Sequence, residues 1–352
     1  MSQQQVKRVL FIPVSSPEGI GEYTRSLILA QRLANDADIH FILNRHASYS
    51  ASCPFPMTLL DCSPTKDITG VNQVISNFRP DVVVFDASGR HQQLQHAKRL
   101  GAKVVFLSQH KRKRNRGMRI RRARYTDVHL VVQPHYLLPP IPWWRRQLLN
   151  HFGHSHPQYV GAIFDEPDVE HQARLLASMD LTAGNYLLFS AGSGAHQLHD
   201  ELAVELLWRE ALLCQQQLNM PCVVVFGSNY PGVIPPSTAE VKSVAQLPTQ
   251  HFVELLSGAR AAVLSGGDTL IQAIALQVPS LAIAVSKDQP QRITACAQRG
   301  LVLAAQTGEL VPQVHHLLMA ETRQQLLRAM ADEPQQAGLA AALVEIRQLL
   351  SR

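Results

Sequence analysis

The sequence predicts an α/β protein with two doubly wound domains, each a parallel sheet covered by helices, that face each other across a cleft. First, short runs rich in Val, Ile and Leu alternate with amphipathic helical stretches. Second, these runs are apolar on both faces, as strands are in a parallel sheet covered on both sides. Third, the alternation is interrupted once and then restarts, and 352 residues are enough for two domains.

The first half of the chain is expected to contain strands at Arg8–Val14, Ile39–Leu43, Met57–Asp61, Asp81–Asp86, Lys103–Leu107 and Val128–Val132. Helices between these strands include Tyr23–Ala34, Gly70–Phe78 and His91–Leu100. Pro, aromatic and His residues interrupt the pattern at Leu137–Pro157. We interpret Tyr159–Pro167 as a strand and turn that link the two domains.

The second half repeats the alternation, with strands expected at Tyr186–Ser190, Cys222–Gly227, Ala261–Ser265, Ser280–Val285 and Leu301–Ala305. Helices are expected at Glu201–Asn219, Thr249–Gly258, Thr269–Gln277 and Gln291–Arg299. The tail from Val311 to Arg352 is helical in pattern, with a break at Asp332–Gln336. The expected divisions are residues 1–160, residues 161–335 and a C-terminal helix at 336–352.

Composition excludes several classes of protein. A hydrophobic share of 46% argues against intrinsic disorder, and no apolar run reaches the roughly 18–20 residues of a membrane-spanning helix. The five cysteines form no Cys-x-x-Cys pair, which favours reduced thiols over a zinc site or disulfides. We expect a soluble, cytoplasmic protein without a bound metal.

The positive charge is concentrated in Lys111–Arg124, where nine residues are Lys or Arg and none is acidic. Nucleic acid is an obvious partner for such a segment, but no recognised nucleic-acid-binding module accompanies it, so we do not expect one. Nearby, Trp143–Arg146 pairs two tryptophans with two arginines, a composition suited to a membrane interface. The alternative is that Trp143 and Trp144 pack against the domain.

A candidate phosphate site lies where a strand ends in Ser265-Gly266-Gly267 and a helix begins at Asp268 or Thr269. Glycines allow a ligand to approach the backbone closely. The helix start offers unpaired N–H groups and the positive end of the helix dipole. An ordinary strand-to-helix turn is the alternative.

With its flanks, this turn resembles the donor-nucleotide motif of GT-B glycosyltransferases. The similarity runs from Ser265 through Pro279 to Lys287–Gln291. It is greatest to the MurG-like peptidoglycan N-acetylglucosaminyltransferases and to the PseG-like UDP-sugar hydrolases. The resemblance implies a GT-B fold made of two Rossmann-like domains, the second of which holds the nucleotide-sugar donor.

The resemblance also implies roles for individual residues. Gly266 and Gly267 would face the diphosphate, Gln272 would hold the ribose, and Asp288 and Gln291 would contact the donor. Gln272 and Thr294 stand where these families have Glu and Asn. A Gln can still hydrogen-bond a ribose hydroxyl, but more weakly than a carboxylate does.

A second small-residue turn, Gly192-Ser193-Gly194, is similar to the Gly-Gly-Ser loop that opens the C-terminal domain in the same families. Small residues there would let the phosphates and the opposing domain approach closely. Gly227 ends the next strand and would line the same edge of the cleft. A plain turn is the alternative for Gly227.

The N-terminal domain contains Gly19-Ile-Gly21-Glu22, which resembles the Gly-x-Gly-His segment of MurG-like and PseG-like proteins. The His there is the presumed catalytic base, and Glu22 takes its place here. Glu22 could instead be an acidic residue favoured by the helix dipole. His110, which follows another strand, is a second candidate base because its ordinary pKa lies near neutrality. A surface His before a basic helix is the alternative for His110.

The resemblance implies transfer of a hexosyl or N-acetylhexosaminyl group from a nucleotide-sugar, UDP-linked, to a hydroxyl acceptor. In MurG-like enzymes a lipid-linked acceptor meets a basic and apolar patch, which would place the protein at the inner face of the membrane in cell-envelope synthesis. The nucleotide-sugar is a substrate, and no cofactor is expected. The alternatives are a PseG-like hydrolase, a sugar-nucleotide epimerase of the same fold and a non-catalytic sugar-nucleotide-binding protein.

Overall fold

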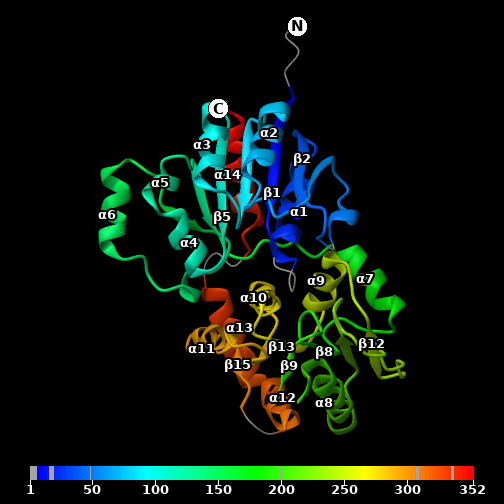
Figure 1. Cartoon of the computed structure of the whole chain (residues 1–352). Coiled ribbons are helices and arrows are strands. Elements are labelled where there is room, and N and C mark those ends of the chain that lie inside the picture. The colour runs from blue at the N-terminus through cyan, green and yellow to red at the C-terminus, as the bar shows by residue number, and fades with distance from the viewer. Residues whose placement is uncertain (1–5, 16–19, 48, 199, 307–308, 334–336) are drawn as a thin grey trace. The chain divides into compact units, whose positions relative to one another are not determined.

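The computed structural model describes residues 6–15, 20–47, 49–198, 200–306, 309–333 and 337–352 (Figure 1). The chain divides into two compact units. Unit 1 comprises Met1–Ile163 with Ala337–Arg352, and unit 2 comprises Phe164–Gln336. The division follows Ile163, and the C-terminal segment belongs to unit 1.

Within its described residues, unit 1 holds a seven-stranded parallel sheet. The order is β3 (Met57–Leu60), β2 (Ala37–Asn44), β1 (Lys7–Pro13), β4 (Val82–Asp86), β5 (Lys103–Ser108), β6 (Val128–Val131) and β7 (Pro157–Tyr159). The strand order reverses between β1 and β4. In such sheets ligands bind outside the carboxyl ends of the strands near this reversal.

The helices of unit 1 cover both faces of its sheet, and alternate residues of β1 show this. Val9 and Phe11 pack in one core with α1 (Gly21–Leu33), whereas Leu10 and Ile12 pack in another with α2 (Ile68–Phe78) and α3 (His91–Arg99). The period of two along a strand sends successive side chains to opposite faces. The remaining helices are α4 (Lys111–Gly117), α5 (Ile120–Ala123), α6 (Trp143–His151) and α14 (Leu339–Leu350).

Helix α14 returns to unit 1 and packs in the same core as α1 (Figure 1, red). Ala342 and Ile346 are fully buried there. Nε of Arg347 forms an ion pair with Oδ2 of Asp36 at 2.9 Å. The C-terminal helix therefore completes the hydrophobic core of unit 1.

Unit 2 repeats the strand order of unit 1 within its described residues. Its six-stranded parallel sheet runs β12 (Val241–Val244), β11 (Cys222–Val225), β8 (Leu187–Ser190), β13 (Ala261–Ser265), β14 (Ser280–Ile283) and β15 (Leu303–Ala304). A short antiparallel pair, β9 (Gln197–Leu198) and β10 (Glu201–Leu202), precedes the first long helix. The helices are α7 (Val169–Ser178), α8 (Ala203–Leu218), α9 (Thr249–Ser257), α10 (Asp268–Ala275), α11 (Gln289–Ala297), α12 (Leu310–Leu318) and α13 (Ala320–Asp332).

Some sequence-based boundaries were wrong. The interruption at Leu137–Pro157 contains α6, which begins directly after Pro142 because proline suits the residues that start a helix. The strand expected at Tyr159–Pro167 is instead β7, which ends at Tyr159. The predicted helix at Glu201–Asn219 begins only at Ala203, since Glu201 and Leu202 pair with β9.

Candidate active site

A buried ion pair lies at the carboxyl ends of the strands in unit 1. Arg25, on α1, is 5% exposed, and Asp86, the last residue of β4, is fully buried. The Nε and Nη2 atoms of Arg25 donate to the two carboxylate oxygens of Asp86 at 2.7 and 2.6 Å. Ser26 Oγ donates a third hydrogen bond to the carboxylate at 3.2 Å. This two-pronged contact fixes the start of α1 against β4.

The same guanidinium also connects to β5. Nη1 of Arg25 donates to Oε1 of Gln109 at 2.8 Å. Burial raises the pKa of the Asp86 carboxyl above its usual value, and the charge and hydrogen bonds of Arg25 oppose that rise. Arg25 therefore joins three neighbouring elements at one edge of the sheet. The sequence shows only an Arg in an N-terminal helix, and its contact with Asp86 spans 61 positions.

Glu22 lies next to this network in the first turn of α1. Its Oε1 is 3.8 Å from Nη2 of Arg25, and its side chain is 20% exposed. Gly21 begins α1, whereas Gly19 lies outside the described residues. Glu22 is thus a partly exposed carboxylate with a buried cation on one side. Such a group can accept a proton from a ligand hydroxyl.

His110 follows Gln109 at the end of β5, where it is exposed and occupies the N-cap position of α4. Lys113, one turn into α4, donates from Nζ to the carbonyl oxygen of Ala87 at 2.8 Å. Burial lowers the pKa of Lys113, and so does the charge of Arg116, whereas the charges of Glu22 and Asp86 raise it. Both candidate bases therefore belong to the carboxyl edge of the same sheet.

In unit 2, two glycine turns pack tightly against each other. Gly194 (φ +90°) and Gly227 (φ +92°) adopt the left-handed conformation that favours glycine. A Cβ at Gly194 would collide with the carbonyl oxygen of Phe226, and one at Gly227 with that of Gly192. The amide of Asn229 donates to the carbonyl oxygen of Ser193 at 2.8 Å. Packing of the protein alone thus accounts for glycine at positions 194 and 227.

The two glycines in the turn between β13 and α10 have different surroundings. A Cβ at Gly266 would lie 2.8 Å from side-chain atoms of Ile293, so glycine there is required by packing. A Cβ at Gly267 would meet only Ser265 Oγ, at 3.8 Å. Gly267 is the N-cap of α10 and is extended, with φ −85° and ψ −159°. The backbone at Gly267 therefore faces open space at the positive end of a helix.

Two residues that the sequence did not single out fix this turn. Oε1 of Gln289, which is 4% exposed, accepts hydrogen bonds from the amides of Gly266 at 3.1 Å and Val285 at 2.9 Å. Nη1 of Arg292 donates to the carbonyl oxygen of Gly266 at 2.9 Å and lies 3.8 Å from Oδ1 of Asp268. A Gln and an Arg at the start of a helix carry no recognisable sequence signal for this contact.

The other predicted donor residues lie on α10 and α11. Thr269 and Gln272 are half-buried on α10, three residues apart and hence on one face of the helix. Asp288 is the N-cap of α11 and accepts a hydrogen bond from Ser286 Oγ at 2.7 Å. Gln291, one turn further, is exposed. Ser265 and Gly192 adjoin, because a Cβ at Gly192 would lie 3.4 Å from Ser265 Oγ.

The basic segment Lys111–Arg124 is helical over most of its length. It forms α4 and α5, and Arg114 is only 1% exposed because Nη1 donates to the carbonyl oxygen of Pro139 at 2.7 Å and to the Tyr159 hydroxyl. On α6, Trp143 is 76% and Trp144 is 50% exposed, so packing of both rings against the domain is excluded. Among the described residues, no helix is long and apolar enough to cross a membrane.

The described part of the chain contains no group of three or more His, Cys, Asp or Glu side chains placed to hold a metal ion. Each unit therefore has its own group of candidate residues. Glu22 and its neighbours lie in unit 1, and the turn at Gly267 with the face of α10 lies in unit 2.

The sequence matches no protein-family model and no curated protein. Solved structures do match along nearly the whole chain. The glycosyltransferase SnogD from Streptomyces nogalater has a TM-score of 0.67 at 17% identity, covering 98% of this chain and 100% of its own. LpCGTa in complex with UDP has a TM-score of 0.61 at 13% identity, covering 99% of this chain and 100% of its own.

A putative UDP-N-acetylglucosamine 2-epimerase from Listeria monocytogenes is also similar, with a TM-score of 0.61 at 13% identity and coverage of 98% of this chain and 97% of its own. Identities this low show the fold alone. The two parallel-sheet α/β units and these similarities confirm the expected fold class: the chain has the GT-B fold.

Proposed function

We propose that the protein is a glycosyltransferase that moves a sugar from a UDP-linked donor to a hydroxyl group of an acceptor. The observation that carries this proposal is the open backbone at Gly267, at the start of α10, in a chain with the GT-B fold. A diphosphate fits such a helix start because unpaired N–H groups and the helix dipole favour negative charge. The bound UDP in the LpCGTa structure supports UDP as the nucleotide.

Unit 2 supplies the donor contacts in this proposal. The diphosphate would lie against the amides at Gly267 and Thr269, and the side chain of Gln272 would hydrogen-bond the ribose. Asp288 and Gln291, on the neighbouring helix start, would contact the sugar. The hydrogen bonds from Gln289 and Arg292 to Gly266 support this arrangement, because they hold the turn in one conformation before a ligand arrives.

Unit 1 supplies the base. The acceptor hydroxyl loses its proton to the carboxylate of Glu22 while its oxygen bonds to the anomeric carbon of the donor. The bond from that carbon to the phosphate oxygen breaks, and UDP leaves with the negative charge, which the start of α10 stabilises. Arg25, which is held by its buried ion pair with Asp86, lies beside Glu22 and positions it. His110 is the second candidate for the same role.

The proposed acceptor is lipid-linked, and the proposed setting is envelope or surface polysaccharide synthesis at the inner face of the membrane. The exposed rings of Trp143 and Trp144, beside Arg145 and Arg146 on α6, support contact with an anionic membrane surface. We propose that transfer of a hexosyl or N-acetylhexosaminyl group proceeds without a metal ion. Activity that survives EDTA would agree with this, and its loss with recovery on added Mg²⁺ would contradict it.

Incubation with UDP-glucose, UDP-N-acetylglucosamine and UDP-N-acetylgalactosamine, with and without bacterial membrane lipids, tests the proposal. The expected result is UDP together with a glycosylated lipid, formed only when the lipids are present. UDP and free sugar without lipids would instead show a hydrolase. A new UDP-sugar isomer without free UDP would show an epimerase, the activity named for the similar Listeria structure. Binding of UDP without turnover of any donor would leave a binding protein.

A further inference from the structure

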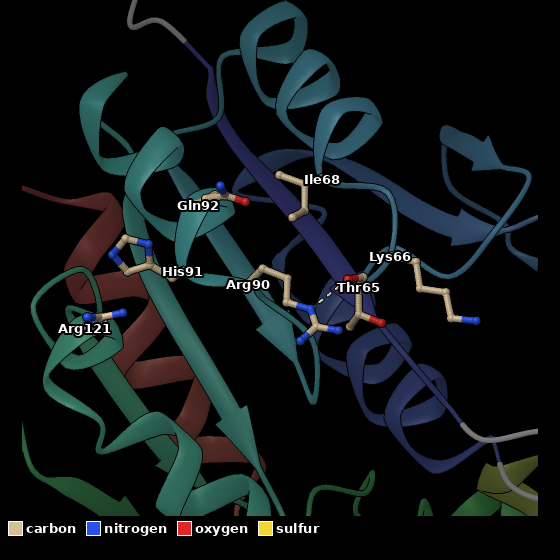
Figure 2. A pocket seen from close by; sticks show the side chains of 7 residues that line it. All are labelled: Thr65, Lys66, Ile68, Arg90, His91, Gln92 and Arg121. Carbon is tan, nitrogen blue, oxygen red and sulfur yellow. Dashed lines mark hydrogen bonds between the residues drawn. The ribbon is translucent and has the colours of Figure 1, made fainter.

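A pocket lies within unit 1, lined by residues outside the candidate active site (Figure 2). Its volume is about 560 Å³, within the roughly 300–1,000 Å³ typical of small-molecule sites. The residues that line it come from the loop before α2, the start of α3 and helix α5: Thr65, Lys66, Ile68, Arg90, His91, Gln92 and Arg121.

Arg90 is the central cation of this pocket. Its Nε donates to the carbonyl oxygen of Thr65 at 2.8 Å, drawn as the dashed line in Figure 2. In that view Arg90 lies between Lys66 on one side and His91 with Arg121 on the other. One nitrogen thus anchors the guanidinium to the loop, and no hydrogen bond is found for its other nitrogens among the described residues.

The pocket is strongly positive. The lining residues include Lys66, Arg90 and Arg121 but no Asp or Glu. Arg116 and Arg122 lie close enough to Arg90 for their charges to interact, and the charge of Arg119 interacts with those of Arg116 and Arg122. In the described part of the chain, none of these arginines pairs with a carboxylate. The nearby carboxylate of Asp67 accepts the amide of Gly70 at 2.7 Å and caps α2.

Arg122, a buried cation next to this cluster, lies over the Phe106 ring, 5.9 Å from the ring centroid, and has no carboxylate partner among the described residues. Arg122 is 8% exposed, and its Nη1 makes no hydrogen bond within the described residues. Burial, together with the charges of Arg116, Arg90 and Arg119, lowers the pKa of Arg122 to about 10. Clustered like charges and an unsatisfied buried donor cost stability unless an anion compensates them. The arrangement is therefore one that a bound anion would stabilise.

The backbone at the start of α3 also favours a bound anion. His91 and Gln92 are the first residues of α3, and their amides make no hydrogen bond among the residues that the structure describes. Both residues line the pocket. The positive end of α3 therefore borders the same pocket as the three cationic side chains.

We propose that this pocket binds a phosphate group of a small phosphorylated ligand. A phosphate monoester carries about −1.5 to −2 charges at pH 7, and guanidinium groups match its oxygens in pairs. A carboxylate brings a single charge for a site with three cations. The cations gather around one pocket, which suits a terminal phosphate, whereas the continuous backbone of a nucleic acid needs a groove or stripe of cations.

This inference rests on the proposed function in one respect: the phosphorylated ligand would be the acceptor. The pocket lies among residues that follow β3, β4 and β5, at the sheet edge that also carries Glu22. Lys113 connects the two places, because its charge interacts with those of both Arg116 and Glu22. An acceptor whose phosphate occupies the Arg90 pocket could thus present a hydroxyl toward the proposed base.

Calorimetric titration of the full-length protein with inorganic pyrophosphate tests the proposal. UDP is present throughout at one concentration, so that it fills the donor site if that proposal holds. We expect saturable binding that Arg121→Glu weakens at least tenfold; Arg121 is exposed and forms no hydrogen bond or ion pair with the described residues, so this variant should fold. Arg90→Ala should weaken binding similarly. Arg99→Ala, an exposed Arg at the other end of α3, is the matched control and should bind like the wild type.

The wild type failing to bind pyrophosphate, or Arg121→Glu binding it normally, would overturn the proposal. Two results would overturn it in favour of a nucleic-acid surface. One is that Arg121→Glu and Arg99→Ala lose pyrophosphate affinity equally. The other is that a single-stranded oligonucleotide, whose binding also depends on Arg99, displaces pyrophosphate. Vesicles of phosphatidylcholine with and without phosphatidic acid distinguish the ligand's source. If the protein binds phosphatidic acid through Arg121 and pyrophosphate competes with this binding, the ligand is a lipid phosphate. If the protein binds pyrophosphate but not the vesicles, the ligand is a soluble phosphate.

The two proposals can fail separately. Gly267→Val changes only the proposed donor turn in unit 2 and should leave pyrophosphate binding at the Arg90 pocket unchanged. Loss of UDP binding with retained Arg121-dependent pyrophosphate binding would refute the donor site alone. The reverse result would refute the phosphate pocket alone.

Discussion

At the scale of single residues, Glu22 carries the proposed chemistry. Glu22→Gln removes the proton acceptor but keeps the shape of the side chain, so turnover should fall roughly 10²–10⁴-fold while UDP affinity stays nearly unchanged. His110→Ala should cause a smaller loss, because His110 is an exposed cap of α4. Steady-state rates with the identified donor, together with UDP titrations, measure both effects. If His110→Ala abolishes turnover and Glu22→Gln does not, the base is His110.

Gly267 and Gly266 form a matched pair of positions. Gly267→Val should fold normally, since a Cβ there meets only Ser265 Oγ at 3.8 Å and the backbone is extended. The branched side chain would nevertheless block a diphosphate, and UDP affinity should fall at least tenfold, about 1.4 kcal/mol. Gly266→Ala should instead lower the free energy of unfolding, because its Cβ meets Ile293. Unchanged UDP affinity in a folded Gly267→Val protein would show that the turn is only structural.

His129 makes the stability of unit 1 sensitive to acid. It is 3% exposed, with a ring nitrogen 2.9 Å from Ser108 Oγ, and burial lowers its pKa from 6.5 to about 3. The unfolded chain therefore binds a proton between these two values that the folded chain does not. Its contribution to stability is complete above about pH 6.5 and is lost as the pH falls toward 3.

His129→Gln removes this titration and keeps a polar group near Ser108. Between about pH 7.5 and about pH 5, the wild type should lose about 2 kcal/mol more unfolding free energy than the variant. Urea unfolding at the two pH values measures the difference. Parallel losses in the two proteins would show that His129 is protonated in the folded state.

The residues of the site differ in how far sequence could find them. Glycine turns after apolar strands are local signals, so the turns at Gly192 and Gly267 were predicted. The contacts of Arg25 with Asp86 and of Gln289 with Gly266 join positions 61 and 23 apart, and nothing in the local pattern marks them. The same holds for the Arg90 pocket, whose cations come from three separate segments.

At the scale of elements, α14 is an integral part of unit 1. Ile346→Ala should lower the free energy of unfolding by about 2–5 kcal/mol, because a fully buried side chain leaves a cavity between α14 and the sheet core. Val344→Ala, on the exposed face of the same helix, is the control and should change it by no more than about 0.5 kcal/mol. Urea unfolding measures both. Equal small effects would mean that α14 is not part of the cooperative core.

Apolar patterning predicted the central elements of both sheets, because strands such as β1 and β13 are buried on both faces. It failed where burial is one-sided or the element is short. Strand β12 reads Val-Lys-Ser-Val and lies at a sheet edge, so it lacks a continuous apolar run. Helix α6 was hidden because its tryptophans are exposed and prolines precede it.

At the scale of the whole molecule, the positive charge has two different uses. Arg114 is buried and ties α4 to the segments around Pro139 and Tyr159, which is a structural role. Arg121 and Arg90 are exposed around a pocket with no carboxylate. In our proposal, part of the net charge of +6 therefore serves to bind an anion at this pocket.

The central claim is that the start of α10 holds the diphosphate of a UDP-linked donor. A crystal structure of the full-length protein with UDP tests this most directly. The account predicts the diphosphate against the backbone of Gly267 and Thr269, with the ribose beside Gln272. A diphosphate bound anywhere else, or crystals that contain no UDP although the start of α10 is accessible in the lattice, would contradict it.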